Sequence, residues 1–232
     1  MADQLFEEWR VYEKLLIHDY MDHRAFFGRL AGEIDNRFDR PVRILDLGCG
    51  DLKPIRPLLA EARPDQYVGI DESEVALAIA RDRLDEDETA GRLIRGDLRK
   101  VLTELDGPFD VIVASFSLHH LADPLEKQAV YADCASLLAA DGFLAVIDVF
   151  CEPEESRDAY LDRWIRHADA RYAQLEPAEK QFLFEHVRAR DYPVSVVQCR
   201  ALGEAAGLPG FAVLLEDAPR LNRLVTLSRA DS

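Results

Sequence analysis

The feature that most constrains the fold is the stretch Arg43–Leu52, with the sequence RILDLGCGDL. A short apolar run reaches Asp46 and is then interrupted by Gly48 and Gly50 at alternate positions. Such a run predicts a buried strand followed by a tight turn, because a glycine backbone turns sharply and admits a ligand at close range. The next segment, 53–59, has early prolines and later apolar residues, which is typical of a helix start. The sequence therefore predicts a strand, a glycine turn and a helix.

Several nucleotide-binding folds share this unit, and the spacing of the glycines distinguishes them. A dinucleotide fingerprint, GxGxxG, requires glycine at position 53, where this chain has Lys53. An NAD-dependent oxidoreductase is therefore disfavoured. The Gly-Lys-Ser/Thr ending of a phosphate-binding P-loop is also absent. An ordinary strand-to-helix turn with two glycines remains an alternative to a ligand-binding turn.

A second acid follows the glycine turn, at the end of the next predicted strand. The apolar run Tyr67–Ile70 ends in Asp71, about twenty residues beyond Gly50. In a strand–helix–strand unit this places a carboxylate at the carboxyl end of the neighbouring strand, where it can accept two hydrogen bonds from a ribose diol. The alternative, that Asp71 only caps the next helix, is weaker because Ser73 already provides an N-cap.

The order of predicted elements indicates an α/β fold. Apolar strands over about 67–71, 92–97, 109–114 and 143–150 alternate with helices, as expected for a doubly wound parallel sheet. A helical segment follows the fifth strand, and two alternating runs near the end predict a hairpin. We therefore predict a doubly wound, seven-stranded, mostly parallel sheet with an antiparallel last strand, N-terminal helices and a helical insertion after strand five.

This order divides the chain into four segments. We expect an N-terminal helical cap over 1–40 and a ligand-binding α/β core over 41–151. A helical lid inserted over 152–192 should lie above the carboxyl edge of the sheet, where ligands bind in such folds. Residues 193–232 should add a final helix and the hairpin that completes the core.

Composition excludes several classes of partner. The 232 residues contain 28 Lys and Arg against 44 Asp and Glu, a formal charge of −16. Such an acidic chain does not favour nucleic acid or an anionic membrane surface. The four cysteines are widely spaced, so neither a disulfide framework nor a metal site is expected. Without a signal pattern or a long apolar run, we expect a cytoplasmic protein.

The glycine turn and its two acids resemble the first motifs of the class I (Rossmann-like) S-adenosylmethionine (SAM)-dependent methyltransferases, and the order of elements over 42–228 is similar to that family. The family often has a third glycine, where this chain has Leu52. The resemblance implies that Asp71 binds the ribose hydroxyls of SAM. It also implies that Asp97 accepts a hydrogen bond from the adenine amino group and that the backbone of Leu98 meets a ring nitrogen. The predicted cofactor-binding residues are Asp46, Gly48, Gly50, Asp71, Asp97, Leu98 and Ser115.

The segment after the fourth strand, SFSLHHLAD over 115–123, is similar to the SxLHHL pattern of small-molecule methyltransferases. It lacks the Asn/Asp-Pro-Pro-Tyr/Phe signature of enzymes that methylate amino groups of nucleic acids. An imidazole can take a proton near neutral pH, so His119 or His120 is the predicted catalytic base. The alternative is that one of them caps the next helix or bonds within the loop, and the sequence does not choose between them.

The predicted substrate pocket combines two polar aromatic residues of the N-terminal segment with the aromatic residues of the insertion. Ordinary packing is the alternative for each of these residues. They are Tyr20, His23, Tyr160, Trp164, Tyr172 and Phe184.

The resulting functional prediction is methyl transfer from SAM to a small organic metabolite by in-line displacement, which yields S-adenosylhomocysteine. The main alternative is a SAM-binding regulator or pseudoenzyme without transferase activity, which Leu52 in place of glycine keeps open. A nucleic-acid or protein methyltransferase lacks the basic surface or the acceptor signature. The sequence leaves open the acceptor, the atom that is methylated and the oligomeric state.

Overall fold

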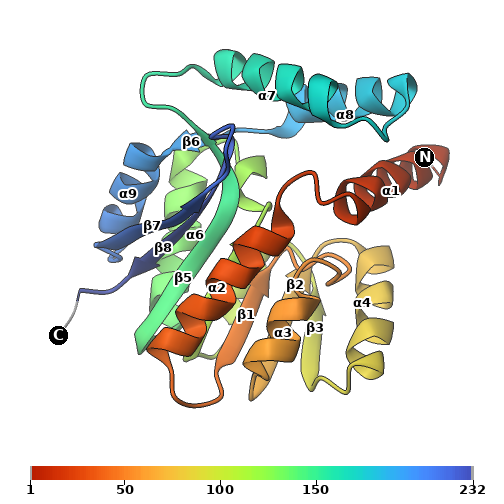
Figure 1. Cartoon of the computed structure of the whole chain (residues 1–232). Coiled ribbons are helices and arrows are strands. Elements are labelled where there is room, and N and C mark those ends of the chain that lie inside the picture. Colours follow the sequence, from red (N-terminus) through yellow and green to blue (C-terminus); the bar gives the residue numbers. More distant parts are fainter. Residues whose placement is uncertain (1, 231–232) are drawn as a thin grey trace.

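The computed structural model describes residues 2–230, with side chains from residue 10 onward. The ends of the predicted first and last segments, residues 1, 231 and 232, lie outside the described residues. Figure 1 shows one twisted sheet with helices on both faces and two further helices above it. The strands are β1 (Arg43–Leu47), β2 (Gln66–Asp71), β3 (Gly91–Arg95), β4 (Phe109–Ser115), β5 (Leu138–Cys151), β6 (Val194–Ser195), β7 (Gly210–Glu216) and β8 (Asn222–Ser228).

The sheet has the order β3-β2-β1-β4-β5-β8-β7, and the two-residue β6 pairs with β5 off this path. Strands β1 to β5 pair in parallel, whereas β8 runs antiparallel to both β5 and β7. The predicted doubly wound order and antiparallel last strand are confirmed. The short β6 adds an eighth strand to the seven that the sequence predicts.

The helices cover the two faces of the sheet and enclose two apolar cores. One face carries α2 (His23–Arg37), α3 (Arg56–Ala62) and α4 (Glu74–Glu86). The other face carries α5 (Leu98–Val101), the 3-10 helix η1 (Leu102–Glu104), α6 (Pro124–Leu137) and α9 (Val196–Ala205). Strands such as β4 are buried along nearly their whole length, as expected for a parallel sheet with both faces covered.

Local sequence sets the helix starts. The side chains of Ser73, Asp123 and Ser195 each accept a hydrogen bond from a backbone N–H of the first turn of α4, α6 and α9. These bonds satisfy N–H groups that otherwise have no partner in a helix. The N-cap that the sequence predicts at Ser73 is therefore confirmed.

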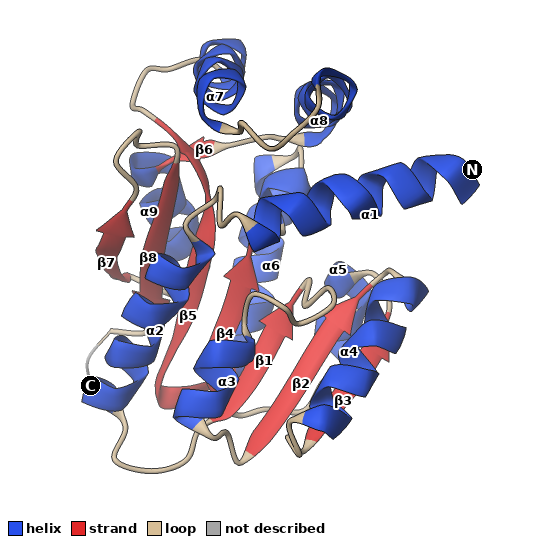
Figure 2. Ribbon diagram, turned by 45° about the vertical axis from the view of Figure 1, so that its right-hand side comes forward, coloured by secondary structure: helices blue, strands red, loops and turns tan. Residues whose placement is uncertain are grey.

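Above the carboxyl ends of the strands lie α7 (Arg157–Arg171), α8 (Pro177–Arg190) and the N-terminal α1 (Ala2–Ile17), as Figure 2 shows. They share a third apolar cluster with the end of β5. The rings of Tyr20 and Tyr172 stack with centroids 4.3 Å apart, and Lys14 Nζ pairs with Glu179 Oε2 at 2.7 Å. These contacts join the N-terminal segment to the insertion. None of the helices within residues 2–230 is long and apolar enough to cross a membrane.

Candidate functional site

The glycine turn after β1 has three residues in the left-handed region at alternate positions. Gly48, Gly50 and Leu52 have φ values of 76°, 54° and 65°. A Cβ on Gly48 would lie 2.7 Å from the Cβ of Ser117, so only glycine fits there. The left-handed conformation costs a leucine about 1–2 kcal/mol of conformational free energy. Burial of the whole Leu52 side chain in the core opposes this cost. The chain therefore keeps the backbone of a third glycine while it places a leucine in the core.

Asp71, at the end of β2, lies directly beside this turn. Its Oδ2 accepts a hydrogen bond from the backbone N–H of Gly50 at 2.9 Å, and its Oδ1 accepts one from the N–H of Ser73 at 2.8 Å. The expected juxtaposition of the second acid with the glycine turn is therefore present. The same carboxylate also holds the turn and the start of α4 in place.

Asp46 is the most buried acid of the site. It is 3% exposed, and its Oδ2 accepts a hydrogen bond from the hydroxyl of Tyr67 at 2.8 Å. Burial raises the pKa of Asp46 to about 7, and the Tyr67 hydroxyl only partly opposes this. The carboxyl group is therefore poised to change its protonation state near neutral pH.

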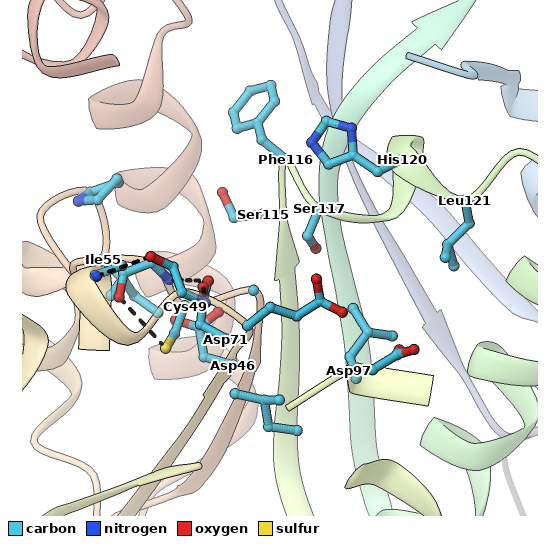
Figure 3. A pocket seen from close by; sticks show the side chains of 18 of the residues that line it. Asp46, Cys49, Ile55, Asp71, Asp97, Ser115, Phe116, Ser117, His120 and Leu121 are labelled. Atoms are coloured by element: carbon cyan, nitrogen blue, oxygen red, sulfur yellow. Dashed lines mark hydrogen bonds between the residues drawn. The ribbon is translucent and has the colours of Figure 1, made fainter. Parts of the chain in front are cut away.

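A cavity of about 550 Å³ opens above the carboxyl ends of β1, β2 and β4, with walls from α1 and α2. Figure 3 shows Asp46, Asp71 and Asp97 along one part of this cavity and Phe116, Ser117 and His120 along another. All of the predicted cofactor-binding residues line it, namely Asp46, Gly48, Gly50, Asp71, Asp97, Leu98 and Ser115.

Asp97 caps the short α5 and is paired with a cation. Its Oδ1 accepts from the backbone N–H of Arg99 at 3.0 Å, and its Oδ2 lies 2.7 Å from Arg99 Nη2. The hydrogen bonds from Arg99 hold the pKa of Asp97 below its usual range. Arg99 also contacts Glu126 at 2.7 Å, and all three charged residues line the cavity. Asp97 is therefore an ionised acceptor at the cavity wall.

The two adjacent histidines have different environments. His120 lines the cavity, whereas His119 is buried behind it, with Nδ1 2.5 Å from Oδ1 of Asp148 on β5. Burial disfavours a charged His119, but Asp148 more than offsets this and the pKa of His119 is raised. Partial desolvation and the charge of His119 lower the pKa of His120, although 44% of its side chain is exposed, so this ring is neutral at pH 7. Of the two predicted catalytic residues, only His120 faces the cavity.

Among the predicted substrate residues, only His23 lines the cavity. It is 7% exposed, its Nδ1 has no hydrogen-bond partner among the described residues, and burial lowers its pKa to about 4. Its ring centroid lies 4.9 Å from that of Phe116. The imidazole is therefore a neutral polar group on an otherwise aromatic wall.

The other predicted substrate residues pack among the helices that lie above the strands. Tyr160, Trp164 and Tyr172 are buried in the third apolar cluster, and Phe184 packs against it. Tyr20 stacks on Tyr172, and its hydroxyl accepts a hydrogen bond from the backbone of Gln174 at 2.9 Å. The structure does not bring these residues to the cavity, and their placement matches the packing alternative.

Several lining residues were not identified from the sequence. Tyr12 of α1 follows the helical spacing of core residues, and Phe116 adopts a φ of 48°, which is uncommon for a bulky side chain. Burial and the nearby Asp51 and Asp71 raise the pKa of Tyr12. No periodicity distinguishes these residues from packing residues. The further lining residues include Met21, Phe27, Pro54, Ile55 and Ser117.

Residues 44–142 match the family described as a methyltransferase domain. A demethylmenaquinone methyltransferase of Leptospira interrogans is 31% identical over 112 residues, which are 47% of this chain and 45% of that protein. The chain thus spans about half the length of that curated relative.

Solved structures share the fold over nearly the whole chain. A SAM-dependent methyltransferase from Clostridium acetobutylicum matches with a TM-score of 0.68 at 9% identity, over 98% of this chain and 100% of that one. The magnesium protoporphyrin IX methyltransferase of Synechocystis, solved with bound SAM, matches with a TM-score of 0.60 at 15% identity, over 91% and 81% of the two chains. Residues 44–142 thus match a methyltransferase domain, and the chain as a whole shares the fold of these solved methyltransferases.

Proposed function

We propose that this protein transfers a methyl group from SAM to a small organic acceptor within the cavity at the carboxyl ends of the strands. One observation carries the proposal: the glycine turn, Asp71 and Asp97 lie on the wall of a single cavity of about 550 Å³. The names of similar proteins support a small acceptor, since they include methyltransferases of demethylmenaquinone and of a magnesium porphyrin. The formal charge of −16 also disfavours a nucleic acid.

The residues present fit the donor. Gly48 and Gly50 both line the cavity, and the lack of a Cβ on each lets a ligand approach the backbone of the turn. Asp71 has two carboxylate oxygens beside that turn, and each can accept a further hydrogen bond from a ribose hydroxyl. Asp97 can accept from an amino group, with the backbone of Leu98 beside it. SAM supplies a methyl group that its sulfonium already activates, so the protein has chiefly to align the reactants and exclude water.

We place the acceptor at the aromatic part of the cavity. Met21, Phe27 and Phe116 provide apolar surface there, and His23 and His120 provide polar atoms. Both imidazoles are neutral at pH 7, because burial lowers the pKa of His23 to about 4, and partial desolvation and the charge of His119 lower that of His120. A neutral imidazole can accept a hydrogen bond from an acceptor O–H or N–H and orient its lone pair toward the methyl group.

The helices above the strands complete this arrangement. Tyr12 of α1 lines the cavity, and α1 packs against α8 through Lys14 and Glu179. We propose that α1, α7 and α8 together form the cover that excludes water during transfer. In this role the aromatic residues of the insertion act by packing and hold the cover rigid.

Calorimetry with SAM, S-adenosylhomocysteine and NAD tests the donor assignment. We expect SAM and S-adenosylhomocysteine to bind one equivalent each, and NAD not to bind. Incubation with methyl-labelled SAM and a fractionated small-molecule extract then tests transfer. Label in an organic product supports the transferase, whereas SAM binding without transfer in any fraction favours the alternative of a SAM-binding regulator.

A further inference from the structure

Three of the six histidines of the chain gather where the end of β4 meets the end of α8. His119 and His120 belong to the 3-10 helix η2 (Leu118–His120), and the ring of His186 lies 5.9 Å from that of His120. Two buried carboxylates, those of Asp148 and Asp191, lie beside them. Methyl transfer as proposed above requires only His120 of this group, so the remainder of the cluster needs another explanation.

The atoms of the cluster converge on one point. Nδ1 of His119 faces Asp148 at 2.5 Å, which leaves Nε2, on the other side of the ring, directed to Oδ1 of Asp191 at 3.6 Å. Nδ1 of His120 lies 3.9 Å from the same oxygen. His119, His120 and Asp191 each offer one ligand atom within 4.8 Å of those of the other two residues.

Asp191 itself supplies an independent indication of a missing partner. The residue is 5% exposed, and its Oδ1 has no hydrogen-bond partner among residues 10–230. A buried carboxylate oxygen without a partner is costly, because it has lost water without replacing it. The separations of 3.6 and 3.9 Å exceed the roughly 2.7–3.2 Å of a hydrogen bond. They are close to the roughly 3.3 Å between two ligands of a tetrahedral ion with bonds of about 2.0–2.1 Å.

We propose that His119 Nε2, His120 Nδ1 and Asp191 Oδ1 form a binding site for a divalent transition-metal cation of the Zn²⁺ class. Two imidazoles and one carboxylate, with a fourth position left to water or a ligand, are a recognised donor set for Zn²⁺. In known metal sites a carboxylate often accepts from the second ring nitrogen of a metal-binding histidine and so fixes its ring and tautomer. Asp148 contacts His119 Nδ1 in this way. Because His120 also lines the cavity, an ion held here adjoins the cavity in which the acceptor is proposed to bind.

The competing arrangement contains no metal. In it a charged His119 lies between Asp148 and Asp191, and His120 Nδ1 donates to the backbone oxygen of Arg190 at 3.3 Å. The ammonium of Lys127, bound to the carbonyl of Leu118, contributes a positive charge nearby. The two arrangements differ in whether the three ligand atoms bind a cation, and titration with metal distinguishes them.

The experiment uses the untagged full chain after treatment with a chelator. Calorimetric titration with Zn²⁺ should give one tight equivalent, and Co²⁺ should give the visible absorption of a four-coordinate ion. Asp191→Asn keeps the size of the side chain and should weaken Zn²⁺ binding at least about tenfold and abolish the Co²⁺ band. His120→Asn, at an exposed position, should do the same even if the buried variant folds poorly. His18→Ala removes an exposed histidine elsewhere and should leave both signals unchanged.

Three results would overturn the proposal. They are no stoichiometric binding to the wild-type chain, binding that Asp191→Asn and His120→Asn both leave intact, and a Co²⁺ spectrum that does not change in these variants.

Thermal unfolding supplies a readout that does not depend on catalysis. Excess Zn²⁺ should raise the melting temperature of the wild-type and His18→Ala chains but not that of Asp191→Asn. Equal shifts in all three would place the metal elsewhere.

Discussion

The carboxylate of Asp71 accepts a hydrogen bond from the backbone N–H of Gly50 at 2.9 Å, across 21 residues of sequence. The bond joins the end of β2 to the turn that follows β1, and so it links the two segments on which the proposed donor site depends. One side chain thus serves both the shape of the turn and the recognition of the ribose. Removal of this side chain should affect stability and affinity together.

For Asp71→Ala we expect SAM affinity to fall about 30- to 1000-fold, since two hydrogen bonds to a carboxylate are together worth roughly 2–4 kcal/mol. The free energy of unfolding should also fall by about 1–3 kcal/mol, because the N–H groups of Gly50 and Ser73 lose their acceptor. Calorimetry and urea denaturation measure the two effects. Asp82→Ala, at an exposed position of α4, is the control. An unchanged dissociation constant for Asp71→Ala would refute the ribose assignment.

Two variants of Leu52 separate the cost of its left-handed backbone from the stability gained by burial of its side chain. Leu52→Ala should lower the free energy of unfolding by about 2–5 kcal/mol, because it empties a fully buried site and keeps the left-handed backbone. Leu52→Gly loses one more carbon but relieves roughly 1–2 kcal/mol of strain. We therefore expect the glycine variant to be the more stable of the two, by about 1 kcal/mol in urea denaturation. If alanine proves better than glycine, as it does in helices, then position 52 carries no strain.

Asp46 should make stability depend on pH. Burial raises its pKa from 3.8 to about 7, so between these values the folded chain binds more protons than the unfolded chain. Stability from this group is therefore present at low pH and is lost as pH rises toward 7, by up to about 4 kcal/mol at 1.36 kcal/mol per pKa unit.

Asp46→Asn removes the ionisation while its amide oxygen can still accept from Tyr67. The variant should therefore gain stability relative to wild type as pH increases from 5 to 8, as measured by urea denaturation at each pH. Asp82→Asn provides the baseline, since that side chain is exposed. Parallel curves for wild type and Asp46→Asn would show that Asp46 is ionised throughout.

His120→Ala should lower turnover at least about tenfold with SAM affinity nearly unchanged, because a group that acts on the acceptor contributes little to donor binding. The lowered pKa of His120 also predicts that its protonation limits activity only below about pH 6. His23→Ala should raise the KM for the acceptor more than it lowers kcat, since His23 offers a buried hydrogen-bonding atom. Steady-state kinetics with the identified acceptor measure both. Full activity of a variant that carries both His23→Ala and His120→Ala would show that alignment of the reactants by the rest of the cavity is sufficient for transfer.

The sheet and the donor end of the site follow from local patterns in the sequence. Gly48, Gly50 and Asp71 stand next to apolar runs that form parallel strands, and the carboxyl ends of such strands meet at one edge. The helix starts at Ser73 and Ser195 follow from capping chemistry that involves only neighbouring residues. Predictions of this kind need no knowledge of distant contacts.

The acceptor end was harder to predict because long-range packing determines it. Nothing adjacent to His119 in the sequence indicates that Asp148, 29 residues away, holds its ring behind the cavity wall. Tyr160 and Trp164 have the same helical spacing whether they pack against a neighbouring helix or line a pocket. The strained backbone of Phe116 likewise depends on its surroundings and leaves no trace in composition.

The contacts that join α1 to the insertion have a consequence for how the chain is made. Tyr20 and Lys14 bond partners that are 152 to 165 positions later in the sequence. During synthesis the α/β core up to β5 can therefore assemble while α1 still lacks its partner. Only when α8 leaves the ribosome can that helix be fixed in place. Of the described elements, α1 is thus among the last to acquire its native neighbours, and the cavity that it lines is completed only after α8 has been made.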